Sequence, residues 1–454
     1  MQAFSIINFQ LSIYQASEIY LYIQLMIKIT TTALLTLLSV SYVSAQKINT
    51  IVNAEEVKRI ETVLSADDML GRKTFTPSID KAADFIASEF KSAGLKTFPG
   101  LSSYKQHFQL IKPTVQSQRL TIDGTASDEK TFAVVTLKDE INLTEKSGLP
   151  FTAIKKGENL YEAASKIVHS KKSQVVIVDT ALSKNFGRIM NYLKSRLFEN
   201  QADILFILSD KQPGSFTFNA KLSFVKSDLN NVVGVLPGKS KKDEFVVFSG
   251  HYDHLGIGEV VNGDSIYNGA NDDAAGTTAV IMLAKYFKAL KNNERSIIFV
   301  AFTAEEIGGF GSQYFSRQLA PEKVMAMFNI EMIGTESKWG KNSAYITGYE
   351  KTDMGDILAK NLKGSSFTFY PDPYTSEQLF YRSDNATLAR LGVPAHTIST
   401  SKMDNEPNYH KPSDEIGTLD MNNMTEIIKA IALSSTSIVS GKDTPSRVKT
   451  EELK

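Results

Sequence analysis

The residues best suited to chemistry follow short apolar runs of the chain. His251 and Asp253 come directly after the run Glu244–Phe248, whose composition is typical of a buried strand. Asp272 and Asp273 stand further on, directly before a long helical pattern. Imidazole and carboxylate groups are preferred zinc ligands, and ligands bind at the strand ends of open α/β sheets. The pattern therefore predicts a metal site.

The same arrangement recurs further along the chain. The runs Ser296–Phe302, Val324–Ile330 and Ala395–Ser399 have strand composition and alternate with helical segments. This alternation is typical of an α/β fold with a mostly parallel, mixed central sheet flanked by helices. Because the carboxyl ends of parallel strands meet at one edge, the polar side chains that follow them should converge. They are His251, Asp272, Glu305, Glu306, Glu331 and His410.

A zinc site of this kind has a definite ligand requirement. Two zinc ions that share one carboxylate need roughly five protein ligands, with water left between the metals. Glu305 adjoins one candidate ligand and could accept a proton from that water, while Asp253 could orient the imidazole of His251. The candidate ligands are His251, Asp272, Glu306, Glu331 and His410.

Each of these residues also has a structural interpretation. Asp272 or Asp273 could cap the following helix, and Glu305-Glu306 could be a solvated helix start favoured by the helix dipole. Such interpretations do not explain why every one of the residues falls at a strand end in chain order. The remaining histidines have no assigned role in catalysis: His107 and His169 are expected to be solvated or capping, His396 structural, and His254 stays open.

Composition limits the alternatives. Fifty basic and fifty acidic residues cancel, which gives no argument for nucleic acid or an anionic membrane as a partner. The chain has no cysteine, so thiolate nucleophiles, disulfides and cysteine-based metal sites are excluded. A length of 454 residues is enough for a main core and a second unit.

The N-terminal segment has the composition of a secretory signal. Residues 26–45 begin with the positive charge of Lys28, continue through the largely apolar run Ile29–Val40 and end in small residues typical of a cleavage site. The run is short for a spanning helix, although a retained membrane anchor is the alternative. We expect residues 1–25 to be an upstream misassigned start and the mature protein to begin near Gln46, secreted or periplasmic, without stable membrane insertion.

The rest of the chain divides by composition. Helical patterns from Glu55 and from an N-cap at Ser78 precede a region without metal-ligand spacing. This region has short β-rich runs such as Gln174–Val178, and lysine-rich helical pieces such as Leu160–His169 and Asn185–Phe198. We interpret this region as an inserted α+β domain or lid, and the charged tail as disordered. The predicted segments are the signal region 1–45, an N-terminal helical part of the core 46–112, the insert 113–230, the catalytic core 231–440 and the tail 441–454.

A series of motifs resembles a known family, the co-catalytic di-zinc aminopeptidases of metallopeptidase clan MH, family 28. Its relatives include glutamate carboxypeptidase and the transferrin receptor. The resemblance covers residues 232–435 and weakly 60–95, with the motifs in the right order. The motifs are His251-Tyr-Asp253, Gly269-Ala-Asn-Asp272-Asp-Ala-Ala-Gly276, Ala304-Glu305-Glu306-Ile-Gly308, Asn329-Ile-Glu331-Met-Ile-Gly334 and Tyr409-His410-Lys-Pro-Ser-Asp414.

The resemblance implies a zinc exopeptidase-like (phosphorylase/hydrolase-like) fold that binds two Zn²⁺ ions and a peptide substrate. Asp272 would bridge the metals, with His251 and Glu331 on one of them. Glu306 and His410 would hold the other. Protease-associated or lid domains occupy the place of the insert in relatives.

The resemblance also implies roles for residues around the metals. Glu305 would be the general base, and Tyr409 would polarise the scissile carbonyl. Ser383-Asp384 would border the substrate pocket. Two positions depart from the family pattern: Glu331 stands where aspartate is common, and Asn385 stands where many relatives have histidine.

These observations favour a secreted zinc exopeptidase, most simply an aminopeptidase that acts by metal-bound hydroxide with a glutamate base. One alternative is a single-zinc enzyme like glutaminyl cyclase, against which the full ligand set argues. Another is a binding protein on an inactive peptidase scaffold, which would be expected to have lost ligands. The preferred side chain, the role of the insert and the oligomeric state are not predicted.

Overall fold

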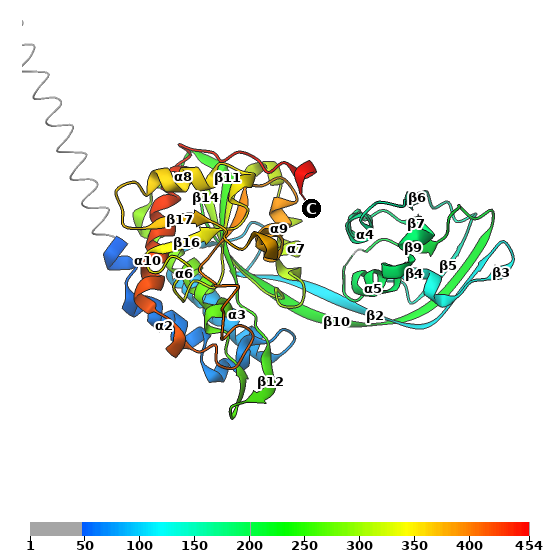
Figure 1. Cartoon of the computed structure of the whole chain (residues 1–454), viewed down its shortest axis with the longest axis horizontal. Helices are drawn as coiled ribbons and strands as arrows, with labels where there is room; N and C mark the ends of the chain where they lie inside the picture. The colour runs from blue at the N-terminus through cyan, green and yellow to red at the C-terminus, as the bar shows by residue number, and fades with distance from the viewer. Residues whose placement is uncertain (1–47, 200, 454) are drawn as a thin grey trace, which may run out of the picture.

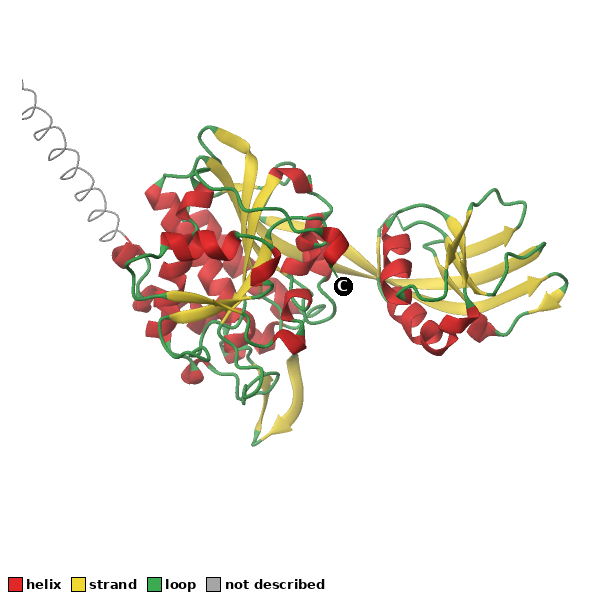
Figure 2. Cartoon of the chain, turned by 45° about the horizontal axis from the view of Figure 1, so that its top comes forward, coloured by secondary structure: helices red, strands yellow, loops and turns green. Residues whose placement is uncertain are grey.

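The computed structural model describes residues 48–199 and 201–453. These residues form two lobes joined by a long β-ribbon (Figures 1 and 2). The predicted signal region, 1–45, lies outside these residues. Among the helices of the described ranges, none is both long and apolar enough to cross a membrane.

The larger lobe is built on a mixed, mostly parallel sheet, as predicted. Strands β18, β15, β11 and β14 are neighbours and run parallel to one another. Strand β16 pairs antiparallel with β18, and β10 pairs antiparallel with β14. The core strands are β11 (Lys241–His251), β14 (Arg295–Phe302), β15 (Val324–Ile330), β16 (Ser343–Ile346), β17 (Thr368–Pro371) and β18 (Ala395–Ser399).

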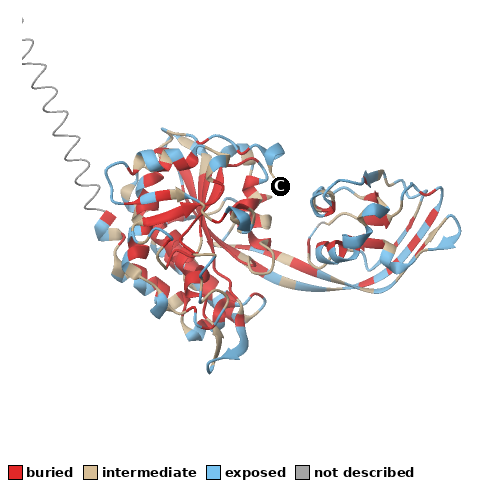
Figure 3. Cartoon of the chain, in the orientation of Figure 1, coloured by how far each residue is buried: buried red, intermediate tan, exposed pale blue. Residues whose placement is uncertain are grey.

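Helices cover both faces of this sheet because its strands are apolar on both sides. Every residue of β14 is buried, which is typical of a strand inside a doubly covered sheet (Figure 3). One face packs against α2 (Ala54–Leu64), α3 (Pro77–Ser92), α6 (Ala275–Leu290), α8 (Met354–Asn361), α10 (Met421–Ser434) and α11 (Thr436–Val439). The other face packs against α7 (Phe310–Ser316) and α9 (Asn385–Ala389).

The insert lies at the end of a ribbon of two long antiparallel strands. Strands β2 (Lys105–Ile122) and β10 (Phe216–Leu236) pair from Lys105 opposite Val232 to Ile122 opposite Phe216. The predicted borders at 113 and 230 therefore fall inside strands that the two lobes share. Short strands complete the ribbon and the larger lobe: β1 (Lys96–Thr97), β3 (Thr125–Ala126), β5 (Glu140–Thr144), β8 (Leu197–Phe198), β12 (Gly256–Val261) and β13 (Asp264–Tyr267).

A separate four-stranded sheet forms the centre of the insert, in the order β4–β9–β7–β6. Helices α4 and α5 pack on one face, and the ribbon and β5 pack on the other. The elements are β4 (Phe132–Val135), β6 (Phe151–Ile154), α4 (Leu160–His169), β7 (Gln174–Val178), α5 (Ser183–Leu193) and β9 (Ile204–Leu208). The insert is thus an α+β unit.

Aromatic side chains join the insert to the larger lobe. Phe198 of β8 lies 5.9 Å from Phe310 of α7, measured between ring centroids. The guanidinium carbon of Arg317 lies 4.3 Å from the centroid of the Phe198 ring. Phe108 of the ribbon stacks on Tyr314 at 4.7 Å. These contacts hold the α5–β8 end of the insert against α7.

Three local predictions are wrong in detail. Thr76, not Ser78, precedes α3, because Pro77 occupies the first helical position, where its missing N–H is not needed. The helical piece predicted to reach Phe198 ends at Leu193, since Phe198 pairs in β8 with β2. The tail is ordered by packing: Val448 is 5% exposed, and the Arg447 guanidinium donates to the carbonyl oxygens of Val324 and Pro321.

Candidate metal centre

The carboxyl ends of four neighbouring parallel strands bring the predicted metal ligands together. His251 ends β11, Glu331 follows β15, and Glu306 lies in the turn after β14. The loop after β18 supplies His410, and the turn before α6 supplies Asp272. Because these strands are parallel, side chains far apart in sequence reach the same edge of the sheet.

One group of possible ligands consists of His251, Asp272 and Glu331, which offer ligand atoms that all lie within 4.8 Å of one another. Nε2 of His251 is 3.1 Å from Oδ1 of Asp272. Even so, neither this nitrogen nor Oε2 of Glu331 has a partner with hydrogen-bond geometry in the described part of the chain, although both are buried. A buried polar atom without a partner costs about 1–3 kcal/mol. The donor set therefore fits a cation.

A second group gathers around Glu306. Nδ1 of His254 lies 2.7 Å from Oε1 of Glu306, and Nε2 of His410 lies 3.2 Å from its Oε2. Asp272, Glu306 and His254 again offer ligand atoms within 4.8 Å of one another. His254 is buried, and its Nε2 has no hydrogen-bond partner among the described residues. The second group thus contains two imidazoles, one more than predicted.

His254 is the histidine whose role the sequence left open. It lies three residues after His251 in the same loop, and that proximity was the only signal for it. Gly269 makes room for its ring: the residue has a φ of 58°, and a Cβ there would lie 2.5 Å from Cγ of His254. A side chain at position 269 would therefore displace the imidazole.

Asp272 is common to both groups. Its Oδ1 faces His251, and its Oδ2 lies 3.2 Å from Nε2 of His410. Burial opposes ionisation, but the imidazoles of these two histidines beside the carboxylate hold the pKa of Asp272 well below its usual range. One ionised carboxylate with an oxygen toward each group is the arrangement that a bridging ligand requires.

The neighbouring aspartates hold the loops of the site. Asp273 accepts hydrogen bonds from the backbone amides of His251, Gly276 and Met332, at 3.0–3.1 Å. It is the capping aspartate of the pair, while Asp272 faces the other ligands. Asp414 accepts from the amides of Asn271 and Asp272 and so fixes the turn before α6.

The carboxylate of Asp253 mainly fixes the turn that carries Glu305 and Glu306, and not the ring of His251. Its carboxylate accepts hydrogen bonds from the amides of Glu305 at 3.1 Å and Glu306 at 3.3 Å. The same carboxylate is 3.8 Å from Nδ1 of His251, while the backbone oxygen of Asp253 is 3.1 Å from that nitrogen. The backbone carbonyl is therefore the group that orients the ring.

Arg72, which the sequence analysis did not select, ties the N-terminal segment to the site. It is 0% exposed, and its guanidinium donates to the carbonyl oxygens of Tyr252, Asn268 and Gly269 as well as Leu64. The carbonyls of Tyr252, Asn268 and Gly269 belong to the loops that carry the candidate ligands, whereas Leu64 ends α2. A lone arginine in a turn offers no local pattern that would reveal these distant contacts.

Glu305 and Tyr409 stand beside the ligand groups. Burial, together with the carboxylates of Glu331 and Asp384, raises the pKa of Glu305 well above its usual value. Tyr409 stacks on His410 with ring centroids 3.9 Å apart. Burial and the surrounding carboxylates raise the pKa of Tyr409, so its hydroxyl stays protonated at neutral pH.

The consecutive residues Ser383, Asp384 and Asn385 have different surroundings. Asp384 is 2% exposed, both of its carboxylate oxygens lack a hydrogen-bond partner within the described ranges, and burial raises its pKa to about 6. Ser383 accepts a hydrogen bond from Asn329 at 2.8 Å. Asn385 is fully buried and donates to the backbone oxygens of Phe380 and Ala395. The departure at 385 thus lies in the packed interior.

His396 lies away from the ligand groups. It is 1% exposed, and its ring nitrogens contact the backbone oxygen of Thr347 and the hydroxyl of Thr352, each at 2.8 Å. Burial lowers the pKa of His396 to about 4, so the ring is neutral.

The comparisons with known proteins point to one family. Residues 231–434 match the family model described as "Peptidase family M28". Aminopeptidase YwaD of Bacillus subtilis is 25% identical over 213 residues, which are 43% of this chain and 41% of that protein. A probable zinc metalloprotease of Pyricularia oryzae is 34% identical over 111 residues, 24% of this chain and 22% of that protein. The chain thus spans less than half the length of these relatives.

Solved structures share the fold at low sequence identity. A zinc aminopeptidase from Bacillus subtilis, BSAP, aligns with a TM-score of 0.52 at 17% identity, covering 87% of this chain and 98% of that one. The aminopeptidase from Aneurinibacillus sp. strain AM-1 aligns with a TM-score of 0.51 at 17% identity, covering 90% and 98%. Residues 231–434 are thus similar in sequence to peptidase family M28, and the chain shares the fold of these two solved structures.

Proposed function

We propose that this protein is a secreted zinc aminopeptidase that removes N-terminal residues from peptides with two zinc ions at the site described above. The observation that carries the proposal is the pair of ligand groups that share Asp272, with unpartnered buried atoms on His251, His254 and Glu331. The names of the relatives, aminopeptidases and zinc metalloproteases, support the same activity.

His251 and Glu331 would hold one ion, Glu306 and His410 the other, and Asp272 both. His254 is a further imidazole for the second ion. When bound, the ions would polarise the scissile carbonyl and lower the pKa of water between them. Because glutamate carries the same donor atoms as aspartate on a longer arm, Glu331 can fill the position where relatives have aspartate.

The residues of this chain would handle the protons and the substrate. Glu305, with its raised pKa, would accept the proton of the attacking water and pass it to the leaving amine. Asp253 holds the amide of Glu305 and so fixes its position. The protonated hydroxyl of Tyr409 would donate a hydrogen bond to the oxyanion that develops on the scissile carbonyl.

Asp384 supports an amino-terminal over a carboxy-terminal specificity. A buried carboxylate with two unpartnered oxygens is complementary to a cation, and the α-ammonium of a peptide is a cation. Ser383 precedes it in the same loop. A carboxypeptidase would instead require a positive group for the terminal carboxylate. Asp384 would thus select the free amino group.

The test is to load the protein with zinc, measure its metal content, and screen aminoacyl, N-acetylated, carboxy-terminal and N-terminal-glutaminyl substrates side by side. We expect two zinc ions per chain and hydrolysis of the free-amino substrates alone. Efficient cleavage of N-acetylated peptides would contradict the aminopeptidase assignment, and cyclisation of glutaminyl peptides with one zinc would replace it. Secretion is tested separately, by fractionating cells that express the full chain.

A further inference from the structure

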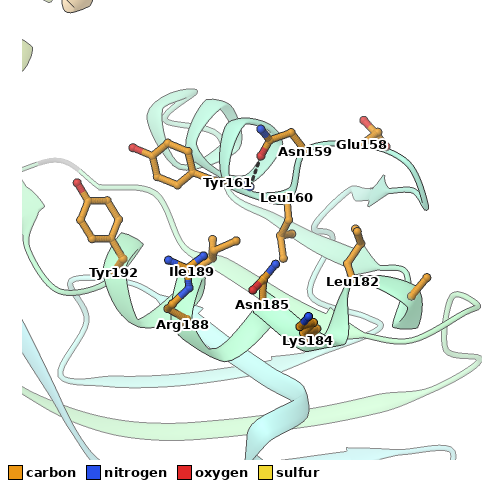
Figure 4. A pocket seen from close by; sticks show the side chains of 11 residues that line it. Glu158, Asn159, Leu160, Tyr161, Leu182, Lys184, Asn185, Arg188, Ile189 and Tyr192 are labelled. Atoms are coloured by element: carbon orange, nitrogen blue, oxygen red, sulfur yellow. Dashed lines mark hydrogen bonds between the residues drawn. The ribbon is translucent and has the colours of Figure 1, made fainter. Parts of the chain in front are cut away.

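A hollow of about 720 Å³ lies between α4 and α5 of the insert (Figure 4). Leu160, Leu182 and Ile189 give it apolar walls, and Asn159 and Asn185 add polar groups. We call this hollow the α4–α5 groove. None of the residues that line it belongs to the metal centre, so its shape needs a separate explanation.

One end of the groove lies beside the turn that carries Glu305. Tyr192 lines the groove, and its hydroxyl oxygen would be 3.2 Å from a Cβ placed on Gly308. The amide of Gly308 donates to the backbone oxygen of Glu305 at 2.9 Å. The mouth of the groove is therefore about one turn of chain from the general base. A smaller hollow that shares Tyr161 and Tyr192 continues from there onto Phe310 of α7.

The aromatic contacts of Phe198 with the catalytic lobe hold the groove in this position. Phe198, a few residues after the end of α5, contacts Phe310, Tyr314 and Arg317 of the catalytic lobe. Because α5 ends only a few residues before Phe198, these contacts hold the Tyr192 end of the groove toward the catalytic lobe. Figure 4 shows both tyrosines at one end and Leu182 and Lys184 toward the other.

The exposed side chains of the groove suit an acidic peptide. Lys184 and Arg188 are four residues apart and so lie on one face of α5, and within the described chain neither forms an ion pair. Glu158 is the single acidic residue of the lining. Tyr161 and Tyr192 are 41% and 51% exposed, with ring centroids 5.9 Å apart. Exposed tyrosines and unpaired cations are typical of surfaces that bind peptides and carboxylates.

The proposed activity decides which part of a peptide could occupy the groove. An aminopeptidase places one residue on the amino side of the scissile bond, so every further residue lies on the leaving side. From Tyr192 to Lys184 the helix spans about 12 Å, at about 1.5 Å per residue. This distance corresponds to about four extended peptide residues.

We propose that the α4–α5 groove binds the segment of the peptide substrate that follows the scissile bond. Lys184 and Arg188 bind a carboxylate at least four residues downstream of the scissile bond, either an acidic side chain or the free carboxy-terminus. Tyr161 and Tyr192 contact the peptide between that carboxylate and the metal centre. This proposal rests on the proposed aminopeptidase function and adds a substrate class to it: short peptides with a downstream negative charge.

The experiment compares three substrates on each preparation: leucine p-nitroanilide, the pentapeptide Leu-Gly-Gly-Gly-Glu, and Leu-Gly-Gly-Gly-Lys-amide. The native chain should favour the acidic over the basic pentapeptide in kcat/KM. Reversing the two charges with Lys184→Glu and Arg188→Glu should lower that preference about tenfold, because two exposed ion pairs become repulsive contacts. The drop should appear mainly in KM.

A matched control carries the same charge change elsewhere on the insert. Lys171→Glu and Lys172→Glu alter two exposed lysines that do not line the groove. This variant should keep the native preference for the acidic pentapeptide. An equal loss of preference in both double variants, or no loss in the Lys184/Arg188 variant, overturns the groove proposal.

Different results would overturn the proposed aminopeptidase function and the groove proposal. Absence of any turnover by zinc-loaded protein overturns the proposed function. In that case calorimetric titration with Leu-Gly-Gly-Gly-Glu tests the groove directly. Binding that weakens about tenfold in the Lys184/Arg188 variant supports the peptide site, and unchanged or absent binding overturns it. Circular dichroism of each variant checks that the fold is retained.

Discussion

The catalytic lobe and the insert both bury an apolar core, but their polar side chains differ in burial and in hydrogen bonding. In the catalytic lobe, His251, His254, Glu331 and Asp384 present buried atoms without hydrogen-bond partners, gathered at one edge of the sheet. In the described part of the insert, only Gln118 has such an atom. The polar groups of the α4–α5 groove are instead mostly exposed.

This difference indicates two kinds of site. Buried unpartnered groups destabilise a fold unless a ligand satisfies them, so a cluster of them marks a place built for bound ions or substrate. Exposed charges need no such ligand and contribute modest, screened interactions. Substitutions in the catalytic lobe should therefore change chemistry and metal content, whereas those in the insert should change selectivity.

The largest effect should come from the adjacent glutamates. Glu305→Gln cannot accept the proton, so turnover should fall about 10²–10⁴-fold while both metals and inhibitor binding are retained. Glu306→Gln removes a charged ligand and should lose metal together with activity. Metal analysis and kcat on the same preparations separate the two. A zinc-depleted Glu305 variant beside a zinc-replete Glu306 variant would show that the roles are reversed.

Glu331 should show the next largest effect. Removing the carboxylate in Glu331→Ala should release one metal and most of the activity, because a buried donor that completes the His251 group is lost. Glu331→Asp restores the donor atoms on a shorter arm and should keep a measurable fraction of both. Zinc analysis of the purified variants provides the measurement. Two full equivalents of zinc in the alanine variant would remove Glu331 from the ligand set.

Variants of the two histidines near Glu306 should differ from each other in zinc affinity by a smaller factor. His410 contacts both Asp272 and Glu306 at 3.2 Å, whereas His254 is 3.9 Å from Asp272. His410→Asn should therefore weaken zinc binding more than His254→Asn, and we expect the His254 variant to lose about 10–100-fold in affinity through its lost contact with Glu306. Competition with a chelator measures both affinities. The reverse order would make His254 the more important imidazole for the second ion.

The last prediction concerns the free energy of unfolding rather than chemistry, and compares a histidine in each region. His396 has a folded-state pKa of about 4, so the folded chain binds fewer protons than the unfolded chain as pH falls below the ordinary value near 6.5. Its contribution to stability is present above pH 6.5 and is lost toward pH 4, by on the order of 3 kcal/mol. Replacing it with glutamine should flatten this part of the pH profile.

The control for this measurement is His107→Gln in the ribbon, where the side chain is 57% exposed. Chemical denaturation at several pH values between 4 and 7 gives the unfolding free energy of each variant. The difference between native and His396→Gln chains should shrink or change sign as pH falls. A pH dependence that is the same in all three chains would contradict the role assigned to His396.

The sequence by itself determined most of the elements and the gathering of the ligands. Strands β7, β15 and β18 have the predicted bounds, as does helix α4, because apolar runs and helical periodicity are local properties of the chain. The convergence of His251, Asp272, Glu306, Glu331 and His410 followed from the rule that parallel strands end at one edge. Within the Asp272-Asp273 pair, Asp272 faces the other candidate ligands, while Asp273 accepts a hydrogen bond from the amide of Gly276.

Only the tertiary structure decided which distant groups meet. The contacts of Arg72 with the carbonyls of Tyr252, Asn268 and Gly269 join residues far apart in sequence. So do the position of His254 beside Glu306 and the packing of Val448. The same holds for the contacts of Phe198 with α7, which place Tyr192, at one end of the α4–α5 groove, beside Gly308. Local patterns carry no information on such contacts, because they arise when separate elements pack and their buried polar groups find partners.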